Sequence, residues 1–200
     1  MSEYKFPTET VDLPSKGLIY PSDSPLRSGK VEMKYMTAKE EDILTNQAFI
    51  QQGVVLDKLL KALTLDKFNI KTLFPGDKNA LIVASRVLGY GKDYSFTTKD
   101  EDYTVDLSVL ENKTFDESLI TPDGTFKFTL PSSENEVEFK FLTELDEEKI
   151  AQEIEGLKKV NKNSSSEVTT RLKHQIVAIN GSSDKNDIRE FVDTMLLASD

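Results

Sequence analysis

The sequence offers few residues suited to covalent catalysis. Its 200 residues include no cysteine and a single histidine, His174, which lies between Lys173 and Gln175. A Ser-His-Asp triad would have to use this histidine, and no Gly-x-Ser-x-Gly turn is present to hold a nucleophilic serine. His174 lies off the apolar stripe of its predicted helix, so we expect it to face solvent. The residue types therefore argue against a nucleophilic enzyme.

The stretch GYGKDYS, residues 89–95, superficially resembles a phosphate-binding loop. Phosphate cradles place glycine N–H groups at the start of a helix, where the helix dipole is positive. These glycines instead follow a predicted helix and lead into a predicted strand. We therefore expect Gly89 and Gly91 to stop the helix and form a sharp turn.

The segment KDEDYTVD is the candidate site for a hard metal ion. It supplies four carboxylates, those of Asp100, Glu101, Asp102 and Asp106. An EF-hand loop that began at Asp100 would need a glycine at its sixth position, where Val105 stands, and only Glu111 at position twelve matches. A charged hairpin turn explains the segment better, so we expect no metal ligands here. A metal-dependent hydrolase built on Asp100, Asp102 and Asp106 is the less favoured hypothesis.

Arg86 is the only charged residue within ALIVASRVLGY, a stretch that is apolar on nearly all sides and predicts a central buried helix. A guanidinium in such a helix needs a carboxylate or carbonyl partner. We expect it to pair with the acidic segment that follows, with contact to another protein as the alternative. Arg86 and Tyr90 are therefore candidate partner-binding residues.

The N-terminal stretch LPSKGLIYP, residues 13–21, combines two prolines and a glycine with the apolar cluster Leu18, Ile19 and Tyr20. The prolines and Gly17 favour an extended path of low conformational entropy, which suits a segment that lies along a surface. We expect it to be ordered, with Leu18 and Tyr20 buried against the protein's own helices or, as the alternative, against a partner. Leu18, Ile19 and Tyr20 complete the candidate partner-binding set.

The net charge of −10 is concentrated in the middle of the chain. Residues 1–90 carry 12 basic and 11 acidic side chains, residues 91–160 carry 8 and 18, and residues 161–200 carry 5 and 6. Such an acidic field repels phosphate backbones and anionic membranes, so we expect neither nucleic acid nor membrane as a partner. MSEYKFPTET has no signal-peptide pattern and no apolar run is long enough to span a membrane, which favours a soluble, non-secreted protein.

Helices predominate in the predicted N-terminal half. Residues 31–35 alternate as a short one-faced strand, and Thr37 and Glu40 form a capping box for a helix that runs to about residue 52 and stops at Gly53. Asp77 is the predicted N-cap of the buried helix that contains Arg86. Between these two helices, a further helix carries its apolar stripe on Leu56, Leu59, Leu60 and Leu63.

The pattern changes at residue 92. DYSFTT, DYTVDL, GTFKFTL and VEFKFL alternate as strands of one small antiparallel β unit, with PSSENE as a hairpin turn. From Thr143 the pattern is helical again, and NKNSSS (161–166) is a polar linker. Asp184 is the predicted cap of the last helix. The helix before it carries a stripe of Val168, Leu172, Ile176 and Ile179, and ends at Gly181.

The predicted fold class is α+β, mainly helical, with an extended N-terminal arm and a small antiparallel β insert. Residues 1–36 form the arm and a short strand, residues 37–91 the N-terminal helical part, residues 92–142 the acidic antiparallel β unit, and residues 143–200 the C-terminal helical part.

Several segments, taken in order, resemble the baseplate hub family of T-even-type, contractile-tailed bacteriophages. LPSKGLIYP is followed by a short strand and MTAKEEDILTN, then by VLDKLLKAL and ALIVASRVLGYGKDYSF. The resemblance covers most of residues 11–96, and TTRLKHQIVAING at 169–181 is similar too. In this family the protein is a hub subunit or a hub assembly chaperone.

The resemblance implies a protein without catalytic activity or cofactor that binds other phage hub and tail proteins during tail assembly in the host cytoplasm. A structural subunit kept in the virion's tail baseplate is the alternative. Relatives often carry cysteine pairs after YGKDYSF, which suggests a zinc ribbon. Here Thr97, Thr98, Lys99 and Asp100 stand in that segment, so a ribbon-like hairpin would hold without metal. Relatives also continue beyond LLASD, which has no C-cap signal, so we expect a frayed last helix or a longer natural chain.

Overall fold

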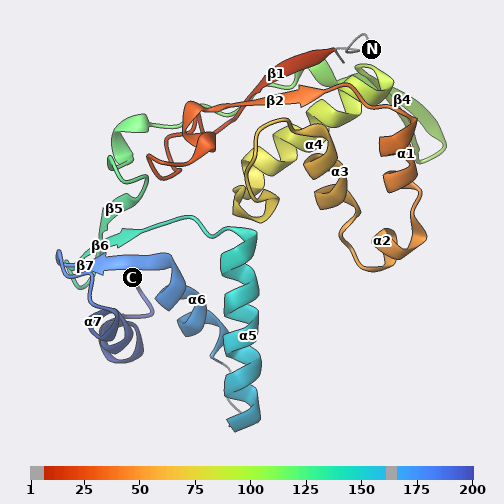
Figure 1. The fold of residues 1–200 in the computed structure, drawn as a ribbon. Coiled ribbons are helices and arrows are strands. Elements are labelled where there is room, and N and C mark those ends of the chain that lie inside the picture. The colour runs from red at the N-terminus through yellow and green to blue at the C-terminus, as the bar shows by residue number, and fades with distance from the viewer. Residues whose placement is uncertain (1–6, 161–165) are drawn as a thin grey trace. The chain divides into compact units, whose positions relative to one another are not determined.

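The computed structural model describes residues 7–160 and 166–200 (Figure 1). By its contacts the chain divides into two units. Unit 1 comprises Met1–Gly17 and Ser22–Phe115, and unit 2 comprises Leu18–Pro21 and Asp116–Asp200. The boundaries predicted after residues 36, 91 and 142 all fall inside these units rather than between them.

The predicted fold class is wrong in its balance of helix and strand. In the described part of the chain, 46% of the residues are helical, in seven helices and several short 3-10 and π-helical turns, and 20% are extended, almost all of them in seven strands of three small antiparallel sheets. The fold is thus an α+β mix and not a mainly helical one. The single β unit predicted over 92–142 is also wrong, because its first two strands form their own sheet and its last two pair with a strand near the C-terminus.

Unit 1 contains two antiparallel strand pairs and four helices. Its first sheet pairs β1 (Thr8–Asp12) with β2 (Lys30–Lys34). Its helices are α1 (Ala38–Leu44), α2 (Gln47–Gln51), α3 (Val55–Leu63) and α4 (Pro75–Tyr90). Its second sheet is the hairpin of β3 (Asp93–Thr98) and β4 (Glu101–Asp106). Short 3-10 turns occupy Pro25–Ser28, Ile70–Thr72 and Leu107–Val109.

The core of unit 1 forms where the predicted strand and helix stripes meet. Val31 and Met33 of β2 are buried while Lys30 and Glu32 are exposed, as the alternation predicted. Most of the predicted leucine stripe of α3 is buried, and Leu56 is the exception. The predicted capping box of α1 is confirmed. The helix predicted to continue to residue 52 is broken, because Asn46 accepts the N–H of Phe49 and begins α2.

α4 begins differently from the prediction. Phe74 is its N-cap and Pro75 its first residue, so the prediction of Asp77 as N-cap is wrong. Asp77 lies in the first turn, buried, and accepts hydrogen bonds from the Ser15 N–H at 2.9 Å and the Ser15 hydroxyl at 2.7 Å. α4 is also not buried on all sides, because one side lines an open groove of about 460 Å³ with β1 and the segment after β4.

The loop between β1 and β2 needs glycine at two positions. Gly17 and Gly29 have φ values of 76° and 71°. A Cβ on Gly17 would lie 2.6 Å from the Gly29 nitrogen, and a Cβ on Gly29 would lie 2.6 Å from the Lys16 carbonyl oxygen. The Leu13 N–H also donates to the Gly29 oxygen at 2.8 Å. The first half of LPSKGLIYP is therefore an ordered loop, fixed by backbone contacts that leave no space for side chains.

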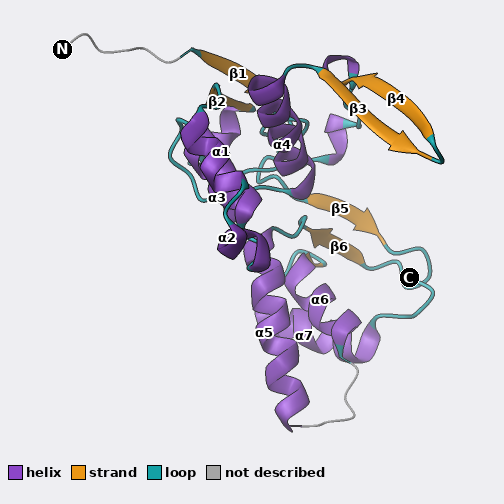
Figure 2. Cartoon of the chain, turned by 90° about the vertical axis from the view of Figure 1, so that its right-hand side faces the viewer, coloured by secondary structure: helices purple, strands orange, loops and turns teal. Residues whose placement is uncertain are grey.

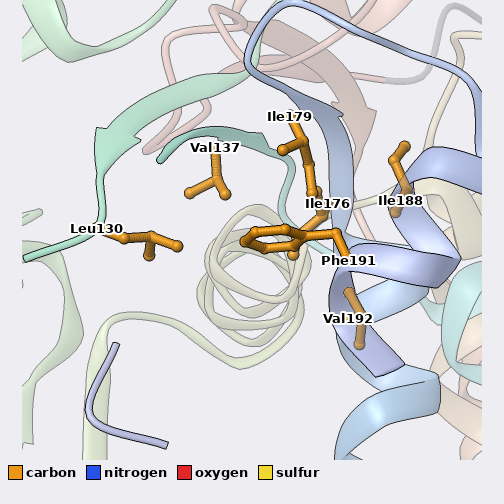
Figure 3. Packing of buried hydrophobic residues seen from close by; sticks show 7 residues of the cluster. All are labelled: Leu130, Val137, Ile176, Ile179, Ile188, Phe191 and Val192. Carbon is orange, nitrogen blue, oxygen red and sulfur yellow. The ribbon is translucent and has the colours of Figure 1, made fainter. Parts of the chain in front are cut away.

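Unit 2 combines three helices with a three-stranded antiparallel sheet of order β5-β6-β7. Its strands are β5 (Phe126–Thr129), β6 (Glu136–Phe139) and β7 (Ile176–Ile179). Its helices are α5 (Glu144–Val160), α6 (Glu167–Gln175) and α7 (Lys185–Glu190). A 3-10 turn occupies Glu117–Leu119 and a π-helical turn follows α7 at Phe191–Met195. Figure 3 shows its apolar cluster, in which β6 and β7 face α7 and the turn after it: Leu130, Val137, Ile176, Ile179, Ile188, Phe191 and Val192.

The helix predicted through residue 181 is wrong in its second half. α6 ends at Gln175, and the next four residues form β7, in which Ile176 and Ile179 bury their side chains and pair with Phe139 and Val137. β-Branched side chains fit the pleated surface of a sheet, and pairing with β6 overrode the helical spacing. The predicted cap at Asp184 is confirmed. Most of the predicted linker, residues 161–165, lies outside the described residues.

Candidate functional site

The β3–β4 hairpin follows α4 (Figure 2). Its aromatic side chains lie on one face. Tyr94 and Phe96 point to the same side of β3, because side chains alternate along a strand. The antiparallel register sets Val105 opposite Tyr94, and Tyr103 opposite Phe96. Directly opposed residues share a face, so these four side chains form one apolar surface, hereafter the aromatic face.

The rings of the aromatic face contact one another and remain open to solvent. The ring centroids of Tyr94 and Phe96 are 5.9 Å apart, and those of Phe96 and Tyr103 are 5.7 Å apart and nearly parallel. The four side chains are each between 38% and 44% exposed. A contiguous exposed apolar patch of this kind is typical of surfaces that bind another molecule.

The opposite face of the hairpin is polar. The hydroxyls of Ser95 and Thr104 are 2.8 Å apart, and the Thr97 hydroxyl donates to Asp102 at 2.6 Å. The hairpin thus has the two-sided pattern of a sheet that covers a core, yet its apolar side is uncovered. A two-stranded hairpin on its own is only marginally stable, so contacts from outside its two strands matter for its order.

Arg86 supplies part of that anchoring. Its guanidinium donates to the Gly91 oxygen at 2.9 Å and to the Asp93 oxygen at 3.3 Å. It also lies 5.0 Å from the ring centroid of Tyr90 and 5.7 Å from that of Tyr94. The prediction that Arg86 finds a carbonyl partner at the start of the acidic segment is confirmed. Its guanidinium joins the end of α4 to the first strand of the hairpin.

Tyr90 extends the aromatic surface from the hairpin toward α1. Its side chain is 49% exposed, and its hydroxyl donates to Glu41 of α1 at 2.9 Å. This hydrogen bond to a carboxylate raises the pKa of Tyr90 above its ordinary value. The predicted residues Arg86 and Tyr90 therefore lie side by side at the border of the aromatic face.

The hairpin is strongly acidic around its rings. Residues 93–106 contain five acidic side chains and one basic side chain. Glu101 accepts the Tyr103 hydroxyl at 2.6 Å, which raises the pKa of Tyr103. Asp106 accepts hydrogen bonds from Lys92 and Ser108, which lower its pKa to about 2. These carboxylates give the surroundings of the aromatic face a charge complementary to lysine and arginine.

The predicted residues of the N-terminal arm lie elsewhere. Tyr20 is buried, with 2% of its surface exposed, while Leu18 and Ile19 are half-buried. These residues belong to unit 2, where a Cβ on Gly124 would lie 2.9 Å from the carbonyl carbon of Ile19. The arm is ordered and Tyr20 is buried, as predicted, but Leu18 is buried only in part. The structure thus brings Arg86 and Tyr90 together in unit 1, and it assigns Leu18, Ile19 and Tyr20 to unit 2.

The side chains of the aromatic face were missed as site residues from the sequence. Their signal was present, because DYSFTT and DYTVDL alternate and only Lys99 and Asp100 separate the two strands. A two-residue hairpin loop fixes the register, and the register places all the rings on one side. Lys99 and Asp100 have φ values of 50° and 65°, which the turn requires even though neither residue is glycine.

The remaining candidates for chemistry do not form a catalytic arrangement. Within residues 7–160 and 166–200, no group of three or more histidine or carboxylate side chains is placed to hold a metal ion. His174 is half-buried rather than solvent-facing, and its Nε2 atom lies 2.8 Å from Glu153. In the segment at 89–95, Gly91 follows the end of α4 at Tyr90 and has a φ of 82° before β3, as predicted, but Gly89 lies inside the helix, so the prediction that it stops the helix is wrong.

No protein-family model matches the sequence, and neither a protein of curated function nor a solved structure is similar to it. No helix in the described ranges is both long and apolar enough to cross a membrane.

Proposed function

We propose that this protein is a non-catalytic binding protein of contractile-tail assembly, which binds another phage hub or tail protein through the aromatic face. The observation that carries the binding role is the uncovered set of rings on a hairpin whose other side is polar. The phage context is supported by the resemblance of residues 11–96 to the hub family. Arg86 and Tyr90 border the contact surface.

The partner surface is one that presents arginine or lysine beside aliphatic side chains. Aromatic rings attract cations through their π faces, and the nearby carboxylates strengthen that preference. Arg86, which lies over Tyr90 and Tyr94, is an example within the chain of a guanidinium on these rings. Aliphatic neighbours on the partner would cover Phe96 and Val105. A nucleic acid is disfavoured, because residues 93–106 of the hairpin carry five carboxylates and one lysine.

Co-expression with candidate hub and tail proteins from the same genome tests the proposal. The double variant Phe96→Ser/Tyr103→Ser removes two central rings, and Ser95→Ala/Thr97→Ala changes the polar face of β3. We expect a complex of defined stoichiometry with one of these proteins for the unmodified chain and for the polar-face variant. The aromatic-face variant should not form it. Equal complex formation by all three proteins would contradict the assigned surface.

The role in assembly has a structural alternative, a subunit retained in the mature baseplate. Both roles need the same contact surface, so binding alone does not separate them. Quantitative protein analysis of purified virions does. We expect the protein to be absent or far below the amount of the hub proteins. Stoichiometric presence would contradict a transient chaperone role and favour the structural subunit.

A further inference from the structure

Unit 2 contains a cleft whose charge is opposite to that of its surroundings. The cleft has a volume of about 400 Å³ and is lined by residues of α5, α6, β7, α7 and the segments beside them. Its apolar floor includes Ile176 and Ile188, both of which are buried. Five basic side chains line it, those of Lys140, Lys149, Lys173, Lys185 and Arg189.

This concentration of cations is not explained by composition. Residues 116–200 carry 10 basic and 18 acidic side chains, so this part of the sequence is strongly acidic. Half of its basic residues nevertheless line the one cleft, together with two carboxylates, Asp146 and Glu153. Asp193 pairs with Lys173 at 2.6 Å without being part of the lining. Even with Asp193 counted, the cations outnumber the carboxylates by two.

Internal partners account for only part of the set. Lys140 pairs with Asp146 at 3.0 Å, and His174 shares a 2.8 Å contact with Glu153. Burial alone would raise the pKa of Asp146, but hydrogen bonds from Lys140 and Thr143 lower it below its ordinary value. This carboxylate is therefore committed to its partners in its charged form.

The other cations of the cleft have no such partners. Lys149, Lys185 and Arg189 make no ion pair with any carboxylate of the described residues. They come from two different helices, and Lys185 and Arg189 lie one turn apart on α7. Like charges that share a cleft repel one another, and an anion between them would remove that repulsion.

We propose that this cleft binds a small, multiply charged phosphate anion of the pyrophosphate class. The inference goes beyond the proposed protein-binding function and rests on a different unit of the chain. Two lysines and the planar fork of Arg189 are donors suited to several phosphate oxygens at once.

The size and surroundings of the cleft restrict the ligand. Its lining contains no tyrosine, phenylalanine or tryptophan, and its single ring, that of His174, is held by Glu153 at 2.8 Å, so the cleft offers little surface on which a nucleotide base could stack. The acidic surface around the cleft repels extended polyanions, which excludes nucleic acid. A compact anion lies inside the cationic region and avoids that repulsion. Small polycarboxylates share the charge but not the tetrahedral oxygen arrangement, and the experiment must separate the two classes.

Isothermal titration calorimetry of the full chain with inorganic pyrophosphate, in a phosphate-free buffer of constant ionic strength, tests the proposal. The variant Lys149→Gln/Lys185→Gln/Arg189→Gln removes the unpaired cations. The variant Lys127→Gln/Lys158→Gln/Lys159→Gln changes net charge equally, but none of its three positions lines the cleft. We expect saturable one-site binding, with affinity reduced at least tenfold in the first variant and within twofold of the unmodified chain in the second. Citrate should bind at least tenfold more weakly than pyrophosphate.

Three results would overturn the proposal. An absence of binding at millimolar pyrophosphate would remove the site altogether. Equal losses in the two charge-matched variants would show that the anion responds to net charge and not to the cleft. Citrate binding as tight as pyrophosphate binding would contradict the phosphate class. Circular dichroism spectra that match the unmodified chain ensure that lost binding in a variant is not lost folding.

Discussion

Glu40 is the residue whose substitution gives the most quantitative prediction. Its side chain is 1% exposed, yet it is charged: Lys34 donates to it at 2.8 Å, and the Thr37 N–H donates to it at 3.0 Å. Burial alone would raise the pKa of Glu40, but these hydrogen bonds outweigh burial and lower it from 4.5 to about 2. Glu40 fixes the first turn of α1, the helix that carries Glu41 to the Tyr90 hydroxyl.

The lowered pKa sets the size and sign of the effect. Lowering the pKa of Glu40 from 4.5 to about 2 corresponds to about 3 kcal/mol of stability, because the folded state binds this proton less tightly than the unfolded chain does. The contribution is fully present above the unfolded pKa, near 4.5, and is lost as the pH falls through the folded pKa, near 2. Glu40→Gln should therefore lower the free energy of unfolding of unit 1 by about 3 kcal/mol at neutral pH.

The unmodified chain and Glu40→Gln should become equally stable in acid. Urea titrations at several pH values, followed by hydrogen exchange of the α1 and α3 amides, measure unit 1 on its own. The difference between the unmodified chain and Glu40→Gln should shrink between pH 4.5 and 2. Asp42→Asn, an exposed carboxylate on the same helix, is the matched control and should change stability by less than about 0.5 kcal/mol. If the two free energies of unfolding differ by the same amount at every pH, the prediction is contradicted, because the loss in Glu40→Gln would then come from packing and not from charge.

Three further substitutions test local contacts, each of which lies within one of the two units. Gly124→Ala should destabilise unit 2 by about 2 kcal/mol, because φ is 78° and the new Cβ would meet the Ile19 backbone; differential scanning calorimetry measures it. Asp100→Gly should slow hydrogen exchange across the β3–β4 hairpin about fivefold, because glycine removes roughly 1 kcal/mol of strain at a positive φ. Ser15→Ala should lower the stability of unit 1 by about 2 kcal/mol in urea unfolding, because buried Asp77 loses a charge-assisted hydrogen bond.

Each of these three predictions has a control and a result that would contradict it. Gly53→Ala is the control for Gly124→Ala, because it shares the positive φ but has open space around the new Cβ; equal losses would show that the Ile19 contact is unimportant. Unchanged or faster exchange in Asp100→Gly would show that the turn is not strained. For Ser15→Ala, stability equal to that of the control Ser28→Ala, an exposed serine in the same loop, would contradict the role given to Asp77.

The elements predicted best from the sequence are those whose local residue pattern agrees with how they pack in the fold. Val31 and Met33 alternate and face the core, and Thr37 and Glu40 sit at a helix start, so strand β2 and the cap of α1 were both predicted. The prediction of a helix over residues 176–179 was wrong because their spacing fits a helix while their β-branched side chains fit a strand. Only the partner strand β6 decides between these, and a partner distant in sequence is invisible to local patterns.

In the candidate site, too, features with a local signal were predicted and features that depend on distant residues were missed. Arg86 was found because a lone charge in an apolar helix needs a partner, and its carbonyl contacts follow from that need. The aromatic face required one further step, the pairing of two strands through a two-residue turn. Asp77 was misassigned because its carboxylate is used by Ser15, which is 62 residues away in the chain. Long-range hydrogen bonds of this kind leave no local pattern in the sequence.

The affinity of the purified hub partner for the Phe96→Ala variant shows whether the aromatic face is the binding surface. Phe96 is 40% exposed, so a partner that covers it buries roughly 80 Å² more, worth about 2 kcal/mol or about 30-fold in Kd. We predict that Phe96→Ala weakens binding about 30-fold when it is made in the Asp100→Gly background, in which we expect the hairpin to stay formed. In the same background, Thr97→Ala should leave the Kd within about twofold of that of Asp100→Gly alone. Unchanged affinity in Phe96→Ala, with the hairpin intact by hydrogen exchange, would contradict the claim that the aromatic face binds the partner.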